Sequence, residues 1–250
     1  MPEPYLSIVI PAYNEALRIG TTLEKICRYV ESRSYTWELV VVDDGSTDET
    51  ARIVTDFARE SSRIRILRNK PNRGKGFSVR RGALEARGEF VLFTDADLSA
   101  PIDELDSLFK ALNCDGADAA VGSRALRREL VGRRQPWFRE YGGRFFNLLV
   151  RFLTGLSIRD TQCGLKLFRR VSTHRAFELQ RATGFGFDPE LLFLIRRTGG
   201  KMIEVPVRWY NDPASRVQFL RDSTRMVLDL IALRWRAWRG TYGPAPEHGK

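Results

Sequence analysis

The first half of the chain alternates short apolar runs with stretches of helical periodicity, and this alternation restricts the possible folds more than any other feature. Between the runs, hydrophobic residues recur every three or four positions, as from Leu23 to Val30. The apolar runs occupy residues 5–10, 38–44, 64–67, 90–94 and 118–123. A repeated strand–helix–strand order is typical of a parallel sheet whose faces are covered by helices. The sequence therefore predicts an α/β fold.

Local signals refine this picture of the first half. The run at 38–44 is continuous rather than alternating, which indicates a strand buried on both faces. Ser46 and Glu49 have the spacing of a capping box, which predicts a helix opening just after that strand. Another helix is expected near 77–86, and Pro101 has the position favoured in the first turn of the next helix.

The second half of the sequence is less regular. Residues 122–143 are rich in Arg and Gly and are expected to form a mobile loop. Residues 144–156 have the pattern of a basic, apolar helix. Strands are expected at 165–168 and 201–210, with a helix around 188–198 between them.

The segment 217–239 combines an apolar helical pattern with interleaved arginines. Its apolar residues near helical spacing are Phe219, Leu220, Met226, Val227, Leu230, Ile231, Trp235 and Trp238. A basic amphipathic helix of this kind is suited to lie in the interface of an anionic membrane. The alternative is a helix packed on the protein's own core with a solvated basic face.

The chain is strongly basic. Its 250 residues carry a formal net charge of +10, with a pI near 9.9. Such a charge indicates an anionic partner, which could be nucleic acid, anionic lipid or a phosphorylated substrate. No window approaches the roughly 18 apolar residues of a membrane span, and the N-terminus lacks the pattern of a signal peptide. A cytoplasmic protein is expected, with Cys27, Cys114 and Cys163 as reduced thiols.

Polar residues follow three of the expected strands at their carboxyl ends: PAYNE at 11–15, DDGS at 43–46 and DAD at 95–97. Ligands of open parallel sheets bind at this edge. The pair Asp95 and Asp97 could present hard oxygen ligands to one divalent cation, together with substrate phosphates. The alternative is that Asp97 or Ser99 caps the helix that follows.

Two further stretches have both a functional and a structural interpretation. Asp43 and Asp44 could accept hydrogen bonds from a nucleobase or ribose, or could belong to a turn that leads into a helix. In residues 69–77, backbone N–H groups with Lys75 or Arg73 could approach a phosphate. The alternative for that stretch is a solvated basic loop.

The order and spacing of PAYNE, DDGS, GKG (74–76) and DAD resemble the nucleotide-sugar domain of family 2 glycosyltransferases, which have the GT-A fold. Later stretches resemble the branch that transfers β-glucosyl groups to dolichyl (polyprenyl) phosphate, with the mannosyl-transferring branch nearby. These stretches are GSR (122–124), RDTQCGLKLF (159–168), GFGFDPELL (184–192) and VPVRWYNDPASRV (205–217). The resemblance covers about residues 5–235. It implies a mostly parallel mixed sheet flanked by helices, with a C-terminal amphipathic helix.

The resemblance also implies roles for individual residues on the donor side. Pro11, Tyr13 and Glu15 would line the base pocket together with Asp44, and Asp43 would lie beside it.

On the diphosphate, the resemblance places Lys75 and a divalent ion. Asp95 and Asp97 would hold Mg²⁺ or Mn²⁺, with Asp97 counted among the catalytic groups. The mannosyl branch often has Gln where this chain has Ser99, so the resemblance does not extend to a third side-chain ligand there.

On the acceptor side, Arg124 and Arg139 match arginines expected near the acceptor phosphate. Asp160 and Gln162 would border the sugar. A hydroxyl acceptor would require a carboxylate base, for which Asp160 is the nearest candidate.

We therefore expect one GT-A domain over 1–240. Its nucleotide-sugar half would cover about 1–123, its acceptor- and membrane-facing half about 124–240, and a disordered tail would follow at 241–250. The expected activity is inverting, metal-dependent transfer of glucose from UDP-glucose to a polyprenyl phosphate, with the protein peripheral on the cytoplasmic face of the membrane, attached through residues 217–239.

Alternatives remain in two classes. The same chemistry could use GDP-mannose, UDP-GlcNAc or a soluble acceptor. A different class is a non-catalytic protein that binds nucleic acid or an anionic membrane. No nucleic acid partner is expected, because carboxylates at the strand ends would repel a phosphate backbone.

Overall fold

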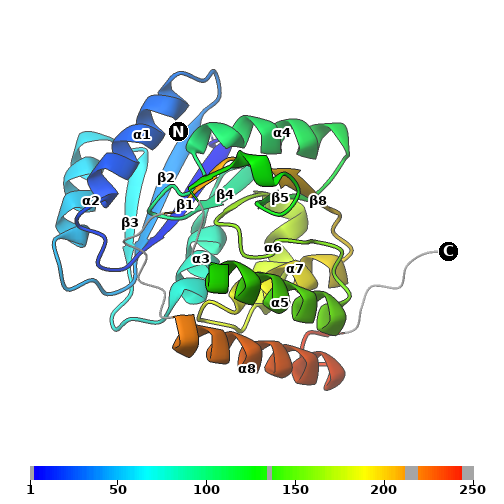
Figure 1. The fold of residues 1–250 in the computed structure, drawn as a ribbon. Helices are drawn as coiled ribbons and strands as arrows, with labels where there is room; N and C mark the ends of the chain where they lie inside the picture. The colour runs from blue at the N-terminus through cyan, green and yellow to red at the C-terminus, as the bar shows by residue number, and fades with distance from the viewer. Residues whose placement is uncertain (1–2, 134–136, 212–218, 244–250) are drawn as a thin grey trace.

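The computed structural model describes residues 3–133, 137–211 and 219–243, without the side chains of 133, 137–141, 144 and 219–223. Its centre is a seven-stranded sheet with the order β3-β2-β1-β4-β7-β5-β8 (Figure 1). The strands are β1 (Leu6–Ala12), β2 (Trp37–Asp43), β3 (Ile64–Arg68), β4 (Phe90–Thr94), β5 (Ala119–Ser123), β7 (Leu165–Arg169) and β8 (Met202–Pro206). All pairings are parallel except those of β7 with β4 and β5. The predicted mostly parallel mixed sheet is confirmed.

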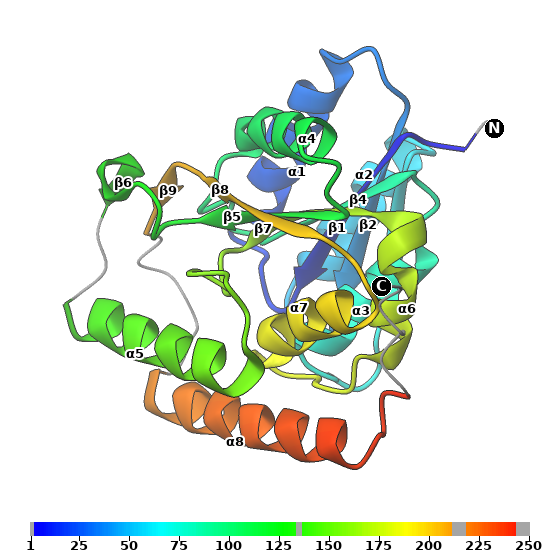
Figure 2. The same cartoon turned by 90° about the vertical axis from the view of Figure 1, so that its right-hand side faces the viewer.

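Helices cover both faces of the sheet (Figures 1 and 2). Helices α1 (Ile19–Glu31), α2 (Thr50–Glu60) and α4 (Leu105–Cys114) pack into one hydrophobic cluster. The cluster on the other face includes α3 (Lys75–Glu85), α5 (Trp137–Thr154), α6 (Arg170–Leu179), α7 (Phe187–Arg197) and α8 (Phe219–Trp238). Strand β2 sends Val40 and Val42 to this second cluster and Leu39 and Val41 to the first. It is buried on both faces, as predicted.

Strands β2, β1 and β4 are neighbours and run parallel, so their carboxyl ends meet at one edge of the sheet. The register pairs Ala12 at the end of β1 with Asp43 at the end of β2. Strand β4 ends at Thr94, and Asp95 follows it. The three polar motifs that were predicted to follow strands therefore emerge together.

The predicted capping box at Ser46 and Glu49 is wrong. Helix α2 begins at Thr50, and its N-cap residue makes no side-chain hydrogen bond. The Ser46 hydroxyl instead accepts the N–H of Asn14 at 2.8 Å, and Asp48 accepts the N–H of Thr50 at 3.0 Å. The Ser46 hydroxyl therefore bonds just beyond the end of the neighbouring strand β1 and not to the helix that the local spacing predicted.

Other local predictions need correction. Pro101 precedes a 3₁₀ turn (Ile102–Glu104) rather than starting α4 directly. Residues 122–143, expected as a mobile loop, contain a 3₁₀ turn (Arg128–Leu130), strand β6 (Val131–Arg133) and the start of α5. The strand expected over 201–210 is broken after Pro206, and β9 (Trp209–Tyr210) leaves the main sheet to pair with β6.

Helices α5 and α8 lie side by side at the outside of the second cluster (Figures 1 and 2). The inner side of α8 buries Met226, Leu230 and Leu233. Its outer side leaves Ile231 and Trp235 more than half exposed. Both expectations for this segment are met in part, because the helix packs on the core and still presents apolar side chains outward. No helix in the described ranges has the length and apolar character needed to cross a membrane.

The chain continues beyond α8 in an ordered turn, which differs from the disordered tail expected from 241. Tyr242 is only 3% exposed. Its ring packs against Phe193, and its hydroxyl donates a hydrogen bond to Glu190. Residues 244–250 of the expected tail lie outside the described part of the chain.

Tyr242→Ala is expected to lower the free energy of unfolding by about 2–4 kcal/mol, because it empties a buried aromatic site and removes a hydrogen bond from a buried carboxylate. Urea unfolding measures the change. Trp238→Ala is the matched control, since Trp238 is 82% exposed, and its effect should stay within about 0.5 kcal/mol. Equal effects of the two substitutions would contradict the ordered turn.

Candidate functional site

The two aspartates of the DAD motif occupy a tight turn directly after β4. The N–H of Asp95 donates to the carbonyl of Gly164 at 3.2 Å. Leu98 has a left-handed φ of 47°, and Asp97 Oδ1 accepts the N–H of Ser99 at 2.9 Å. The 3₁₀ turn that follows has no side-chain cap, so the alternative in which Asp97 or Ser99 caps a helix is wrong.

The carboxylate of Asp95 affects the pKa of Asp97. Burial and the nearby Asp95 carboxylate raise the pKa of Asp97 above its usual value. Two carboxylates held this close favour a cation between them.

Lys75, the first residue of α3, faces this turn. Its Nζ lies 2.7 Å from Asp95 Oδ1, and both side chains are about a quarter exposed. Although burial lowers the pKa of Lys75, the carboxylates of Asp95 and Asp188 outweigh that effect and raise it. The structure thus brings together the residues predicted to serve the diphosphate and the metal.

Asp44 organises the loop that carries Lys75. Its carboxylate accepts hydrogen bonds from Asn69 Nδ2 at 2.7 Å, from Arg73 N at 3.0 Å and from Gly74 N at 2.8 Å. The N–H of Phe77 donates to the carbonyl of Thr183 at 3.1 Å. The N–H groups of residues 73, 74 and 77 are thus already bonded, so the prediction that backbone N–H groups of this stretch bind phosphate fails at these three positions.

The glycines of this loop allow a close approach rather than flexibility. Gly74 has a φ of 97°, and a Cβ there would lie 2.4 Å from the carbonyl oxygen of Thr183. A Cβ at Gly76 would lie 2.5 Å from Phe187 Cβ. Loop 74–76 therefore packs directly on residues 182–187.

The residues predicted to line the base pocket lie at the ends of β1 and β2. Pro11 is partly buried near the end of β1, and Tyr13 is exposed just beyond it. Glu15 forms an ion pair with Arg18. Asp43 is buried and pairs with Arg68 at 3.0 Å.

Asn14, which the sequence did not single out, joins the two strand ends. It has a left-handed φ of 55°. Its N–H donates to Ser46, and its Oδ1 accepts the N–H of Thr47 at 2.8 Å. The Asn between Tyr13 and Glu15 was a signal, since Asn tolerates this backbone conformation.

Arg124 and Asp160 form a bidentate pair at the end of β5. Arg124 Nε and Nη2 lie 2.7 and 2.8 Å from the Asp160 oxygens, and the Arg124 N–H donates to Oδ2 at 2.9 Å. Against the opposing effect of burial, Arg124 lowers the pKa of Asp160. Glu204 fixes the backbone N–H of Asp160 at 2.9 Å, and the Arg124 guanidinium lies 5.2 Å from the centroid of the Trp209 ring.

The two remaining predicted residues lie near the helices of the outer layer. Gln162 Nε2 is 3.6 Å from the sulfur of Met226 in α8. Arg139 belongs to α5, but its side chain lies outside the described residues. Its predicted contact with an acceptor phosphate stays a prediction.

Sequence reasoning missed a buried pair beneath the site. Lys166 Nζ lies 2.5 Å from Asp188 Oδ1. A lysine inside the apolar run LKLF was the available signal, because a buried Lys requires a partner.

The donor set fits a divalent cation whose remaining ligands come from a substrate. In the described ranges, no group of three or more His, Cys, Asp or Glu side chains is placed to hold a metal ion. Asp95 and Asp97 could supply two hard oxygen ligands, which would match the way Mg²⁺ binds with substrate phosphates.

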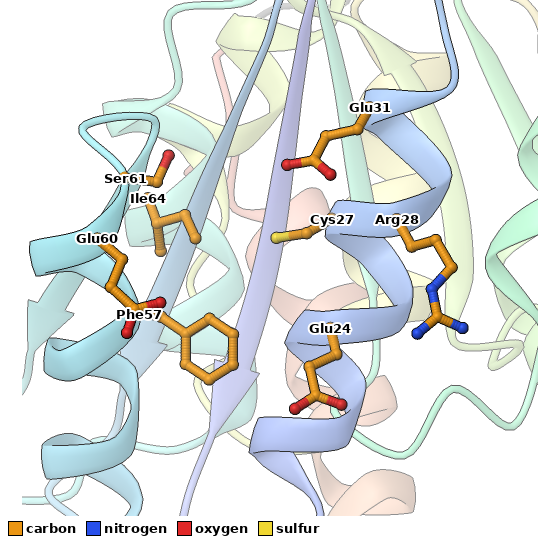
Figure 3. A pocket seen from close by; sticks show the side chains of 8 residues that line it. All are labelled: Glu24, Cys27, Arg28, Glu31, Phe57, Glu60, Ser61 and Ile64. Atoms are coloured by element: carbon orange, nitrogen blue, oxygen red, sulfur yellow. The ribbon is translucent and has the colours of Figure 1, made fainter.

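A separate hollow of about 440 Å³ lies between α1 and α2 (Figure 3). Its lining includes Glu24, Cys27, Glu31 and Glu60. Because α1 ends at Glu31 and β3 begins at Ile64, this hollow lies toward the opposite edge of the sheet. It does not contribute to the site at the strand ends.

Comparison with known proteins identifies the family. The sequence profile described as "Glycosyl transferase family 2" matches residues 7–177. The chain belongs to this family. A dolichyl-phosphate beta-glucosyltransferase of Trichomonas vaginalis is 39% identical, over 94% of this chain and 73% of the relative. The human dolichyl-phosphate beta-glucosyltransferase is 34% identical, over 95% of this chain and 78% of the relative.

Solved structures support the GT-A fold of this family 2 glycosyltransferase. Mannosyl-3-phosphoglycerate synthase from Rubrobacter xylanophilus has a TM-score of 0.70 at 20% identity, covering 99% of this chain and 78% of the other. Glucosyl-3-phosphoglycerate synthase from Mycobacterium tuberculosis, solved with Mn²⁺, UDP-glucose and phosphoglyceric acid, has a TM-score of 0.64 at 20% identity, covering 93% and 80%. The predicted fold class and glycosyltransferase family are both confirmed.

Gly164→Ala is expected to reduce glycosyl transfer by about 100-fold, since a misplacement of about 1 Å can cost that much. A Cβ at this position would lie 2.0 Å from Asp95 Oδ2, so the carboxylate must move. Steady-state rates measure the loss. Gly20→Ala is the control, because its Cβ would meet only Ile53 at an ordinary 3.7 Å. A fully active Gly164→Ala protein would show that the position of Asp95 is unimportant.

Proposed function

We propose that this protein transfers glucose from UDP-glucose to a polyprenyl phosphate, with inversion at the anomeric carbon. The bond between C1 and the β-phosphate oxygen breaks, and its electron pair leaves with UDP. An oxygen of the acceptor phosphate forms the new bond to C1. Two observations support this proposal. The relatives are named as dolichyl-phosphate beta-glucosyltransferases and are 32–39% identical over most of the chain. The second support is the geometry of the strand-end site.

The pairing of Asp160 with Arg124 is the observation that favours a phosphate acceptor over a hydroxyl acceptor. This residue was the candidate base for a hydroxyl acceptor, yet it is 3% exposed and bound on both oxygens by Arg124. A carboxylate whose pKa is lowered by such a pair is a weak base. A phosphate monoester is already ionised near neutral pH, with a second pKa of about 6, and needs no base. The site is therefore better suited to a phosphate acceptor.

Arg124 can still contact that phosphate. Asp160 engages its Nε and Nη2, and about a quarter of its side chain is exposed. A guanidinium has five N–H donors, so donors remain for an anion after the bidentate pair has formed. Arg124 would position the attacking oxygen and reduce the repulsion between the two anions.

The donor diphosphate would lie against Lys75 and the DAD turn. Asp95 and Asp97 are proposed to hold Mg²⁺ or Mn²⁺, which would stabilise the negative charge that grows on the departing UDP. Lys75 adds a fixed positive charge on the same side. Pro11, Tyr13 and Glu15 are proposed to line the base pocket; the carboxylates of Asp43 and Asp44 would support it by holding the surrounding loops.

The lipid part of the acceptor is supported by an exposed apolar face. We define the α5–α8 surface as seven side chains, each more than half exposed: Phe145, Leu148, Phe152, Leu228, Ile231, Trp235 and Trp238. They recur at helical spacing on two helices that lie side by side (Figure 2). Exposed arginines accompany them, among them Arg151, Arg225 and Arg234. Apolar side chains with basic neighbours are complementary to an anionic lipid surface, and we propose attachment to the cytoplasmic face of the membrane.

A donor panel with polyprenyl phosphate and Mg²⁺ or Mn²⁺ tests the activity. UDP-glucose should give labelled lipid and UDP, while GDP-mannose and UDP-GlcNAc should give little.

Asp97→Ala should lower the rate by more than about 100-fold with the fold intact, because a metal ligand outside the core is lost. Asp115→Ala, at an exposed aspartate after α4, is the control. Transfer to a soluble acceptor alone, or full activity of Asp97→Ala, would contradict the proposal.

Replacing Leu148 and Trp238 together by Ser should weaken binding to anionic liposomes by more than about 10-fold, since each buried apolar side chain contributes about 1.5–3 kcal/mol. Co-sedimentation measures binding. Val171→Ser removes an equally exposed apolar side chain from α6 and should change nothing. Activity on a short, water-soluble polyprenyl phosphate should persist in the double variant. Undiminished liposome binding would exclude the α5–α8 surface as the membrane contact.

A further inference from the structure

Lys166 is a fully buried cation in the middle of the sheet. It lies on β7, paired in register with Phe93 on β4, two residues before Asp95. Its side chain has no exposed area. Its Nζ donates to Asp188 Oδ1 at 2.5 Å and to the carbonyl of Cys163 at 2.6 Å. A buried cation is costly unless it is paired and hydrogen-bonded, so this arrangement requires a reason beyond packing.

Asp188 links this cation to the donor site. It lies in the first turn of α7, and its side chain is 6% exposed. Burial raises its pKa, while the ammonium groups of Lys166 and Lys75 both act to lower it. The two ammonium groups lie 5.3 and 5.4 Å from the centroid of the same ring, Phe93. The Lys166–Asp188 pair and the Lys75–Asp95 pair thus lie around one aromatic ring beside the DAD turn, and Asp188 is not itself paired with Lys75 in the described part of the chain.

These two ion pairs bear on a conflict in the proposed donor site, where Asp95 has two partners to serve. Asp95 forms an ion pair with Lys75 at 2.7 Å, yet Asp95 is also a proposed ligand of the divalent cation. Once Asp95 serves the cation, Lys75 would face a divalent positive charge without its carboxylate partner. A second carboxylate within reach of Lys75 would reduce that penalty.

We propose that Asp188, fixed in place by the buried ammonium of Lys166, is a positioning residue that holds Lys75 beside the diphosphate when Asp95 turns to the divalent cation. This inference rests on the proposed function, because it assumes the metal and diphosphate at the DAD turn. Lys166 fixes the Asp188 carboxylate and balances its charge. The pair is neutral, so it can support Lys75 without adding net charge to the site.

A double-mutant cycle tests the proposal. The first change replaces the pair by apolar residues, Lys166→Met with Asp188→Val, which removes no net charge and is often neutral for stability. The second change is Lys75→Met. The measured quantity is the affinity for Mn²⁺ in the presence of UDP, from the electron paramagnetic resonance signal of free Mn²⁺, so no turnover is needed.

With Lys75 present, replacing the pair should weaken Mn²⁺ binding by about 10- to 100-fold, as expected for a partner that orients a metal site. With Lys75→Met, the same replacement should change the affinity by less than about 3-fold, because Asp188 acts through Lys75. Thermal unfolding checks that each variant is folded. Glu38→Gln is the matched control: Glu38 is a buried carboxylate paired with Arg65 at 2.9 Å, near the start of β2 at the opposite edge of the sheet. It should lower stability and leave Mn²⁺ affinity unchanged.

Equal losses of affinity in both backgrounds, or none with Lys75 present, would overturn the positioning role while leaving the proposed function intact. Absence of Mn²⁺ binding by the unmodified protein would overturn the metal assignment itself, and the inference with it.

Discussion

The site depends on the parallel hydrogen-bond ladder that joins β2, β1 and β4 and brings their carboxyl ends to one edge. Strand β2 is buried along its whole length, and β1 almost so. The polar motifs of these three strands therefore gather where the strands leave the sheet. The loops at that edge are fixed by side chains of the neighbouring loops: Asn14 joins the first two strand ends, and Asp44 holds the loop that carries Lys75. The scaffold thus fixes the loops of the proposed donor site without a ligand.

Charge pairing is the second organising principle. Asp160 is matched with Arg124, Asp95 with Lys75 and Asp188 with Lys166, each within 2.5–2.7 Å. Buried or partly buried ions are tolerated only with such partners. The net charge of +10 therefore does not describe the site, where carboxylates and cations alternate. On binding of a divalent cation and a diphosphate, the charged side chains of these pairs would change partners. Each of them already has a partner of opposite charge before binding, so many charges can coexist there.

Helix α8 connects the site to a surface of different chemistry. Its inner face joins the core and touches Gln162 through Met226, and its outer face belongs to the α5–α8 surface. A helix that only covered the core would not need apolar residues on both sides. The structure therefore accommodates both interpretations of residues 217–239, and it places the proposed lipid contact on a helix that also contacts Gln162.

The sequence by itself determined the strand–helix order, the strand ends that carry acidic residues and the apolar character of α8, because these depend on periodicity within a few residues. It missed α6, where few apolar residues recur at helical spacing, and the insertion of β7 antiparallel between β4 and β5. Only the tertiary structure decided which charges pair. Lys166 and Asp188 are 22 residues apart, and Asp44 and Gly74 are 30 apart. Such partners are chosen by the packing of distant elements, which no local pattern encodes.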